Sequence, residues 1–179
     1  ELAAGTLDAA PKLDEFILEQ KLSEKLTPIS FSLLHAADFA LRYEQIIAPC
    51  IARGGIVLAD RYIYTSLVRD SLRGISKKLL NEIYSFAMEP DHVFYFDIDP
   101  VEAIARMKNY KSRSPYVLGM DIGYSKDITE NFLEFLRNQR MEYKRIFNSD
   151  QKNIHILHSN RDPNICFDKV TRILKSYLN

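Results

Sequence analysis

Two short apolar runs, each followed at once by an acidic residue, constrain the fold of this chain more than any other feature. Residues 56–59 read Ile-Val-Leu-Ala and precede Asp60. Residues 93–96 read Val-Phe-Tyr-Phe and precede Asp97. Continuous apolar runs of this length are typical of strands buried on both faces of a parallel sheet. Because ligands bind beyond the carboxyl ends of such strands, Asp60 and Asp97 are the first places to look for chemistry.

Helical patterns alternate with these strands along the chain. Thr27-Pro28 predicts a helix start, and Gly54 ends the helix after about Arg53, with Pro49 expected to kink or shorten its last turn. The other predicted elements are helices over about 76–88, 100–108 and 127–147, a strand over 154–157 and a terminal helix opened by Asp162. The alternation predicts an α/β fold, a doubly wound parallel sheet with helices on both faces.

Composition narrows the functional class. The 179 residues suit a single domain over residues 1–179, and 24 basic residues balance 24 acidic ones. Zero net charge argues against a general nucleic-acid or membrane-surface binder. No apolar run approaches the length of about 20 residues that a membrane helix needs. Cys50 and Cys166 lie far apart without metal or redox spacing, which favours a reducing, cytoplasmic location.

A polar stripe crosses the first long helix. Phe31, His35, Asp38 and Arg42 follow one another at spacings of four, three and four, so they share one helix face. One interpretation is a solvated face with an internal Asp38–Arg42 ion pair. The other is a face toward a ligand, with an aromatic ring for a base and charge for a phosphate.

The segment that follows the first apolar run is rich in polar side chains. A carboxylate such as Asp60 can hold a hydrated magnesium ion, and a guanidinium such as Arg61 can grip phosphate oxygens with two hydrogen bonds. The alternative is an ion pair at the end of a strand. Farther along, we expect a polar, hydrogen-bonding loop that carries Ser66, Arg69, Asp70 and Arg73.

A second basic segment follows Arg106. The loop over residues 109–125 is rich in Pro, Gly, Ser and Lys, which predicts mobility. Lys108, Lys111 and Arg113 concentrate positive charge there. Cations on a closing lid can neutralise a transferring phosphoryl group, and a solvated basic loop is the alternative.

Taken together, these motifs resemble the thymidylate kinase family. The resemblance rests on Leu-His-Ala-Ala-Asp at residues 34–38, the run 54–58, Asp-Arg-Tyr-Ile-Tyr-Thr-Ser at 60–66, Pro-Asp-His-Val-Phe-Tyr-Phe-Asp-Ile-Asp-Pro at 90–100 and Ala-Ile-Ala-Arg at 103–106. The motifs keep the family's order over about the first 110 residues. The resemblance implies a P-loop kinase fold and phosphoryl transfer from ATP, with Mg²⁺, to dTMP, giving dTDP for dTTP biosynthesis.

The resemblance also implies a role for each matching position. Asp60 would lie beside the metal and the phosphates, and Arg61 would grip the acceptor phosphate. Arg106 opens a lid over about residues 107–125, in which Lys108, Lys111 and Arg113 would meet the ATP phosphates. The substrate-binding positions implied are His35, Asp38, Phe39, Arg42, Tyr62, Ser66, Arg69 and Asp70. No nucleic-acid or membrane partner is implied, and a homodimer through helix faces would fit the family.

The chain departs from the family at positions that read the base and sugar. His35 stands where the family has an aromatic residue that stacks on thymine. Phe39 replaces an arginine, for which Arg42 is the candidate substitute. Arg69 and Asp70 replace a Tyr-Gln pair. These changes leave the preferred base open.

The sequence contains no Gly-x-x-x-x-Gly-Lys-Ser/Thr motif, the loop that cradles ATP phosphates. We expect this loop upstream of Glu1, because residues 1–6 resemble the tail of the family segment Arg-Glu-Pro-Gly-Gly-Thr. Three hypotheses follow: a thymidylate-kinase-like enzyme, a non-catalytic nucleotide-binding relative, and a deoxynucleoside kinase with the same fold.

Overall fold

The computed structural model describes residues 2–3, 26–147, 153–159 and 162–178. The chain divides into two compact units. Unit 1 comprises Glu1–Met88 and Ser114–Tyr116, and unit 2 comprises Glu89–Arg113 and Val117–Asn179. Both units pair parallel strands and carry helices, which confirms the predicted α/β class. None of the described helices is long and apolar enough to cross a bilayer.

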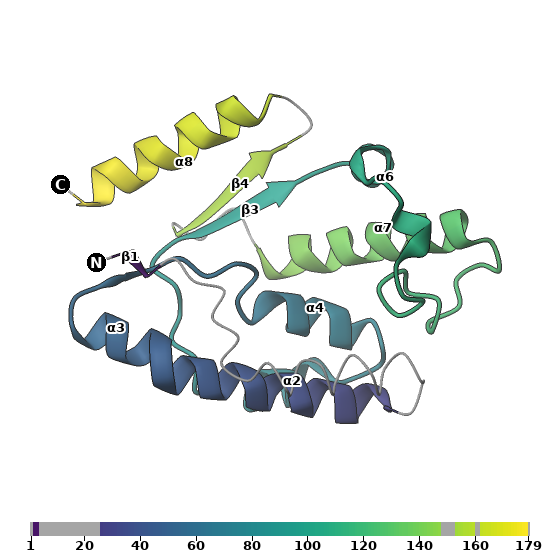
Figure 1. Cartoon of the computed structure of the whole chain (residues 1–179), viewed down its shortest axis with the longest axis horizontal. Coiled ribbons are helices and arrows are strands. Elements are labelled where there is room, and N and C mark those ends of the chain that lie inside the picture. Colours follow the sequence, from purple (N-terminus) through teal and green to yellow (C-terminus); the bar gives the residue numbers. More distant parts are fainter. Residues whose placement is uncertain (1, 4–25, 148–152, 160–161, 179) are drawn as a thin grey trace. The chain divides into compact units, whose positions relative to one another are not determined.

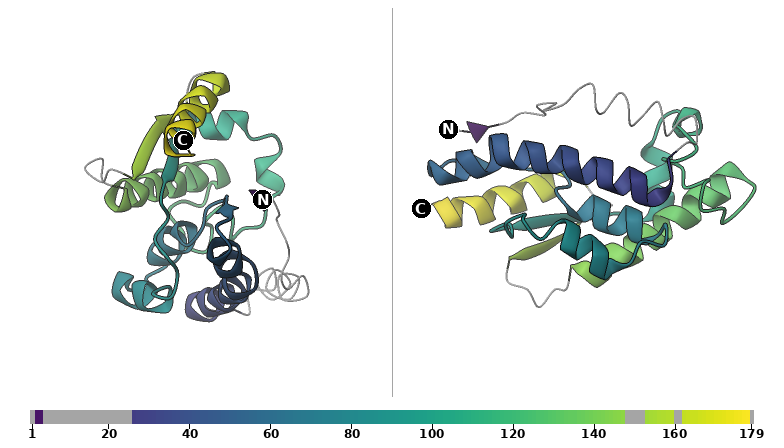
Figure 2. Two further views of the ribbon diagram at one scale, coloured as in Figure 1. Left: turned by 90° about the vertical axis from the view of Figure 1, so that its left-hand side faces the viewer. Right: turned by 90° about the horizontal axis from the view of Figure 1, so that it is seen from below.

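Unit 1 is built on one long helical rod (Figure 2). Helix α2 (Pro28–Arg42) starts at Thr27, whose hydroxyl accepts a hydrogen bond from the Ser30 amide at 3.3 Å. The rod ends with α3 (Ala48–Ala52), after which Gly54 adopts a left-handed φ of 74°. The predicted start at Thr27-Pro28 and the glycine stop are both confirmed.

Between α2 and α3 the rod contains a π-helical turn, Tyr43–Ile47. Pro49 lies just beyond this turn and has no amide hydrogen to donate to the preceding turn. The rod responds with a wider turn that keeps its course, because a π turn closes i→i+5 hydrogen bonds instead of i→i+4 ones. The predicted kink or shortened last turn is therefore wrong: the rod continues to Ala52, and it contains one extra residue in a turn instead.

The strands of unit 1 are shorter and more exposed than predicted. Strand β1 (Leu2–Ala3) pairs in parallel with β2 (Ile56–Val57), Leu2 lying opposite Ile56. Ile56 is 40% exposed and Leu58 is 59% exposed. The expectation of burial on both faces is wrong for this strand, because β1 is its only neighbouring strand in the described part of the chain.

Two further helices complete unit 1, α4 (Tyr64–Ser71) and α5 (Lys77–Ile83). The predicted loop carrying Ser66, Arg69 and Asp70 is wrong, because these residues lie on α4. Val68, 1% exposed, gives α4 its buried side. Helix α5 starts at Ser76 as predicted but ends earlier.

Unit 2 contains a parallel pair of full-length strands. Its elements are β3 (Val93–Asp97), α6 (Pro100–Arg106), a 3-10 turn (Tyr110–Ser112), α7 (Ile128–Ile146), β4 (Ile154–His158) and α8 (Pro163–Leu178). Strands β3 and β4 pair over their whole length, Val93 opposite Ile154 and Asp97 opposite His158. Aspartates precede all three α-helices, and the Asp99 carboxylate accepts from the Val101 amide at 2.9 Å.

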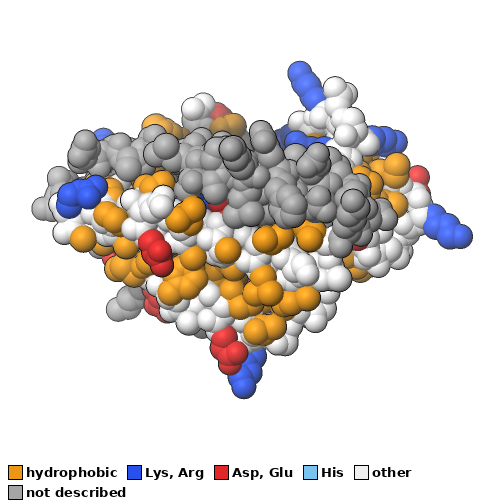
Figure 3. All heavy atoms as spheres, turned by 60° about the horizontal axis from the view of Figure 1, so that its bottom comes forward, with side chains coloured by type: hydrophobic (Ala, Val, Ile, Leu, Met, Phe, Trp, Pro, Cys, Tyr) orange, Lys and Arg blue, Asp and Glu red, His pale blue; other side chains and the backbone are white. Residues whose placement is uncertain are grey.

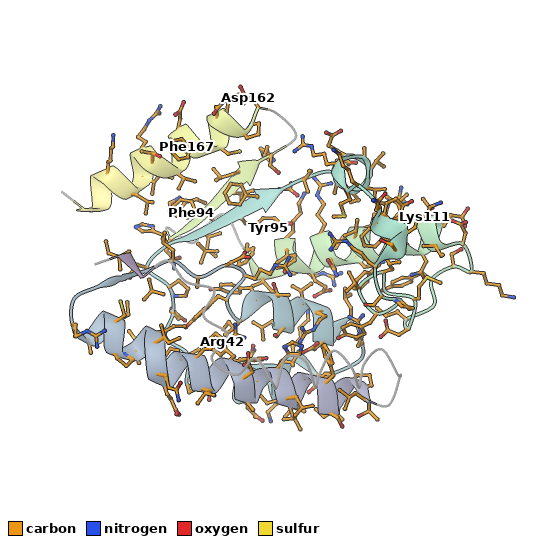
Figure 4. All side chains as sticks on the ribbon, in the orientation of Figure 1. Arg42, Phe94, Tyr95, Lys111, Asp162 and Phe167 are labelled. Atoms are coloured by element: carbon orange, nitrogen blue, oxygen red, sulfur yellow. The ribbon has the colours of Figure 1, made fainter. Side chains whose placement is uncertain are left out.

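Helices α7 and α8 lie on opposite sides of this strand pair (Figure 1). Phe94 and Tyr95 point to opposite faces of β3 (Figure 4). The Tyr95 ring stacks on Tyr143 of α7 at 5.4 Å, and Phe94 stacks on His155 at 5.1 Å. Helices thus cover both faces of the parallel pair, as the doubly wound prediction requires.

Candidate active site

The residues that follow β2 form a strained turn. Arg61 and Tyr62 adopt left-handed φ angles of 67° and 48°, and the Tyr62 amide donates to the Asp60 carbonyl at 2.8 Å. This is the geometry of a three-residue γ-turn, which is rare for residues with side chains. Such positions cost about 1–3 kcal/mol each and persist only where the surroundings impose them.

Two contacts of Tyr62 stabilise this turn. Its hydroxyl donates to the Met88 carbonyl at 2.9 Å, and its ring meets Phe39 edge-on at 5.2 Å. Burial raises the pKa of Tyr62 to about 12, so the phenol stays protonated and keeps donating. Anchored in this way, the turn leaves the Asp60 and Arg61 side chains exposed. Asp60 and Arg61 form no ion pair with each other, so a pair between these two side chains does not explain the motif.

The residues at this turn could bind a magnesium ion through one carboxylate, with waters and substrate phosphates as the other ligands. Protein-bound Mg²⁺ keeps several waters and uses one or two carboxylates together with substrate phosphates. The exposed Asp60 carboxylate can serve as such a ligand. No group of three or more potential metal ligands occurs among the described side chains, so within that part of the chain a complete protein cage is absent.

The polar stripe on α2 contains the Asp38–Arg42 ion pair of the first interpretation, but Phe31 and Asp38 are buried, so the stripe is not a solvated face. Asp38 is 1% exposed and forms an ion pair with Arg42, the residue labelled on this helix in Figure 4. Within the described part of unit 1, the second Asp38 oxygen, Oδ1, and the Arg42 Nε have no hydrogen-bond partner although both are buried. Unpaired buried polar atoms carry a free-energy cost, so this pair favours the interpretation of a ligand-facing stripe.

Helix α4 contributes a fixed guanidinium. Arg69 donates to both oxygens of the neighbouring Asp70, from Nε at 2.6 Å and from Nη2 at 3.0 Å. Asp70 is 1% exposed. Burial opposes the charge of Arg69, but the hydrogen bonds and the charge of Asp70 outweigh it and raise the Arg69 pKa. The Nη1 group has no partner among the described residues and remains able to donate.

Aromatic rings link the two helices of the site. The Arg69 guanidinium lies 4.8 Å from the centre of the Phe31 ring, and His35 meets that ring edge-on at 4.4 Å. Burial and the Arg69 cation lower the pKa of His35 to about 4. His35 is therefore neutral at pH 7 and can stack on a base.

Phe39 takes a different place from the one implied by the resemblance. Its ring packs within an aromatic cluster formed with Tyr62, Tyr84 and Phe86, at centroid distances between 5.2 and 5.9 Å. This cluster supports the anchor of the strained turn. Phe39 thus contacts Tyr62, which anchors the turn that carries Asp60 and Arg61.

Sequence reasoning missed one residue of this site, Tyr116. The Arg73 guanidinium lies 3.7 Å from the centre of the Tyr116 ring, and its Nη2 donates to the Tyr116 carbonyl at 2.8 Å. The Tyr116 ring lies 4.5 Å from Phe31. Tyr116 comes from the loop between α6 and α7, and no sequence motif connects it with α2 or α4.

In unit 2 the predicted lid cations divide into two groups. Arg106 ends α6 and donates to Glu102 at 2.8 Å and to the Ser159 carbonyl at 2.9 Å, so it is fixed at the end of β4. The other predicted cations are exposed on the loop: Lys108, Lys111 and Arg113. Figure 4 shows Lys111 on this loop.

The second half of the predicted lid is tied to α7. Asn131, fully buried, donates to the Leu118 carbonyl at 2.9 Å and accepts from the Ser125 amide at 3.1 Å. A Cβ at Gly119 would lie 2.5 Å from Phe135, so the loop backbone packs directly on the helix. Composition indicates a mobile loop here and gives no signal of this anchoring.

Asp97, the second strand-end carboxylate, is engaged in unit 2 itself. Arg140 donates to both of its oxygens at 2.5 and 2.9 Å, and Lys144 and His158 lie 3.3 and 3.6 Å away. The hydrogen bonds from Arg140 lower the pKa of Asp97. Sequence position indicates chemistry at Asp97, whereas its contacts tie α7 to the strand pair.

Comparison with known proteins supports one family. The model of the thymidylate kinase family matches residues 8–170. A probable thymidylate kinase 2 of Saccharolobus solfataricus is 32% identical over 168 residues, which cover 93% of this chain and 78% of that protein. Thymidylate kinases of Chlorobium limicola (27% identical) and Prosthecochloris aestuarii (30%) each align with 96% of this chain and with 78% and 77% of their own lengths.

Proposed function

The chain belongs to the thymidylate kinase family, and from this premise we propose that unit 1 carries the acceptor site for dTMP. The protein is a phosphotransferase of the nucleoside monophosphate kinase type. The proposed site rests on one observation. Arg69 of α4, fixed by two hydrogen bonds to Asp70, lies over the Phe31 ring of α2, and His35 contacts that ring edge-on. This arrangement brings a ring, a neutral imidazole and a guanidinium donor together in one unit.

We assign the base to the α2–α4 cluster. A pyrimidine can stack on His35, which is uncharged, and can accept a hydrogen bond from Arg69 Nη1 through a carbonyl oxygen. Ser66 lies beside Arg69, with its hydroxyl 3.4 Å from Nη2. The buried Asp38 Oδ1 offers an acceptor on the same stripe.

We assign the acceptor phosphate to the strained turn. Arg61 presents an exposed guanidinium on a backbone fixed by Tyr62, so a phosphate can accept two parallel hydrogen bonds from it. Asp60 would hold a hydrated Mg²⁺, which when bound supplies positive charge for the phosphates. Phosphoryl transfer requires little covalent chemistry from the protein, so catalysis rests on positioning and charge.

The donor and the lid complete the proposal. ATP is the expected phosphoryl donor of the family, and the exposed Lys108, Lys111 and Arg113 are proposed to meet its phosphates. Arg106 would fix the base of the lid through Ser159. Because the printed sequence contains no phosphate-binding glycine loop, the residues that cradle ATP are not assigned to any position of it.

Location and assembly are further proposals. Both cysteines are unpaired buried thiols, which supports a reducing cytoplasm. Hydrophobic side chains are exposed over much of the face in Figure 3. In unit 1, Ile29 and Leu33 are 38% and 50% exposed one turn apart on α2, so we propose a second copy of the chain as the partner of this helix. Sedimentation velocity of wild type and Leu33→Glu tests it, and a monomeric wild type would contradict it.

The activity is tested with a panel of acceptors. Purified protein is incubated with ATP, Mg²⁺ and, separately, dTMP, dUMP, dCMP, dGMP or the free deoxynucleosides, and diphosphate and monophosphate products are separated by ion exchange. We expect dTDP as the main product. Turnover of deoxynucleosides alone would assign the protein to the deoxynucleoside kinases. Binding of dTMP without any product would support a non-catalytic relative.

The role of Arg61 is tested by Arg61→Ala. Losing charged hydrogen bonds to the acceptor phosphate should weaken dTMP binding by about 1.5–3 kcal/mol, roughly 10- to 150-fold. Equilibrium dialysis with labelled dTMP measures this directly. Arg53→Ala is the control, since Arg53 is an exposed arginine at the far end of the α2–α3 rod. Equal affinity of wild type and Arg61→Ala would exclude a phosphate grip.

A further inference from the structure

Three residues of the α6–α7 loop belong to a different unit from their neighbours. Residues Ser114–Tyr116 cluster with unit 1, whereas Arg113 and Val117 on either side belong to unit 2. The segment is therefore attached to unit 1 by its own contacts. Tyr116 contributes to this attachment through Arg73 and Phe31.

Arg73 holds Tyr116 in two ways. Its guanidinium lies over the ring at 3.7 Å, within the range of a cation–π interaction, and Nη2 donates to the Tyr116 carbonyl at 2.8 Å. Nη1 of the same arginine donates to the Arg69 carbonyl at 3.2 Å. One side chain thus connects Tyr116 to the backbone of the residue that carries the fixed guanidinium of the acceptor site.

Phe31 provides a second connection. Its ring lies 4.5 Å from Tyr116, 4.4 Å from His35 and 4.8 Å from the Arg69 guanidinium. Since Phe31 is 5% exposed, it cannot shift toward one neighbour without repacking against the others. The position of Tyr116 therefore bears on both side chains that we assign to the base.

We infer that Tyr116 is a positioning residue for the acceptor: clamped by Arg73, it sets Phe31, His35 and Arg69 in their binding geometry. The inference rests on the proposed function. It also gives the loop a specific role, because Arg113 lies three residues before Tyr116 and Lys111 five. Forming the acceptor site and restraining the basic part of the loop become coupled events, and such coupling is reciprocal.

Steady-state kinetics of matched variants tests the inference. We expect Tyr116→Ala to raise the KM for dTMP about 10-fold, because it displaces the groups that bind the acceptor, and to raise the KM for ATP by a smaller factor through the coupled loop. Tyr116→Phe keeps the ring over Arg73 and should restore the KM for dTMP. Tyr124→Ala is the control, since Tyr124 is an exposed tyrosine of the same loop that belongs to unit 2.

The outcomes separate the two proposals. Wild-type protein that phosphorylates none of the panel overturns the proposed function and this inference with it. Active wild type with an unchanged KM for dTMP in Tyr116→Ala overturns the inference alone, as does an equal rise in both KM values. If Tyr116→Ala fails to fold by circular dichroism, Arg73→Lys takes its place. It keeps the charge but loses the planar fork, so we expect a raised KM for dTMP, and an unchanged value overturns the inference.

A second readout does not depend on turnover. Lys108, Lys111 and Arg113 are exposed trypsin sites just before Tyr116. Saturating dTMP should slow cleavage there in wild type and in Tyr124→Ala, and this protection should be lost in Tyr116→Ala. Full protection of Tyr116→Ala would contradict the coupling.

Discussion

Asp70 in unit 1 and Asp97 in unit 2 are buried carboxylates that each accept two hydrogen bonds from one arginine, but the surroundings of the two pairs differ. Asp70 and Asp97 both accept from the Nε and Nη2 of one arginine, and both side chains are 1% exposed. The arginine of Asp70 is its sequence neighbour, Arg69. The arginine of Asp97 is Arg140, which lies 43 positions away on another element.

The difference separates a pair that we assign to the proposed ligand site from a pair that connects two elements of the fold. The Arg69–Asp70 pair joins two neighbouring residues of α4, and its main effect is to fix a guanidinium beside Phe31 of α2. The Asp97 carboxylate collects Arg140, Lys144 and His158 and thereby fastens α7 to β3 and β4. We therefore propose that similar geometry serves recognition in unit 1 and stability in unit 2.

The largest expected effect is a loss of stability when the ion pairs of Asp97 with Arg140, Lys144 and His158 are disrupted. Arg140→Met should lower the free energy of unfolding by about 3 kcal/mol, at the low end for a broken buried ion pair because Lys144 remains as a partner. Urea denaturation followed by circular dichroism measures it. The KM for dTMP should stay at its wild-type value. A loss below about 0.5 kcal/mol would show that these ion pairs do not fasten α7.

A pH titration separates the two regions next. His35 has a folded pKa of about 4 against 6.5 when exposed, so between these values the unfolded state binds more protons. Stability should therefore fall by up to about 3 kcal/mol as the pH drops from 6.5 to 4, and His35→Phe should abolish this part. Asp97 has a lowered pKa, so its contribution is complete above about pH 4 and is lost only below it. Urea midpoints at pH 7, 5.5 and 4.5 measure the first effect. Identical slopes for wild type and His35→Phe would refute it.

Weakening the Arg69–Asp70 pair should reduce the apparent affinity for dTMP. Asp70→Asn keeps the shape but removes the charge that holds Arg69, so we expect the KM for dTMP to rise about 10-fold, equivalent to about 1.4 kcal/mol. The KM for ATP and kcat should change little. Initial-rate measurements at varied dTMP test this, with Arg140→Met as the matched variant from unit 2. A larger rise in Arg140→Met than in Asp70→Asn would reverse the comparison.

The smallest effects should be equal in the two units. Thr27 caps α2 and Asp127 caps α7, each accepting from the amide three residues on. Replacing either by Ala should cost about 1 kcal/mol of unfolding free energy. Thermal unfolding of both variants measures it. A difference above about 1 kcal/mol between them would mean that the units differ in local stability and not only in their ion pairs.

Sequence reasoning succeeded where the determining interactions are local. Helix α2 begins at Thr27 and α6 follows Asp99, because a cap involves only neighbouring residues. The three predicted strands, at residues 56–59, 93–96 and 154–157, proved to lie where strands form, since period and flanking residues determine their positions. The extent of β2 was not predictable, because pairing partners lie elsewhere in the chain.

The candidate site was predictable to a similar degree. His35, Asp38 and Arg42 were placed on one face from their spacing, and the ion pair and buried position of Asp38 agree with it. Tyr116 and Arg140 were not predictable, because their contacts span 43 residues in each case and no motif marks them. Their roles depend on packing that only the fold creates.

The π-helical turn at Tyr43–Ile47 also bears on how this gene can vary in length. A π turn holds one residue more than the α-helical turn it replaces, so the rod carries a surplus residue at that point. Loss of a single codon there would convert the turn to ordinary α-helix while leaving the faces of α2 and α3 in register. The same loss within α2 would rotate everything beyond it by about 100°. A deletion of one residue should thus be tolerated within Tyr43–Ile47, but not within α2, the helix that carries His35 and Asp38.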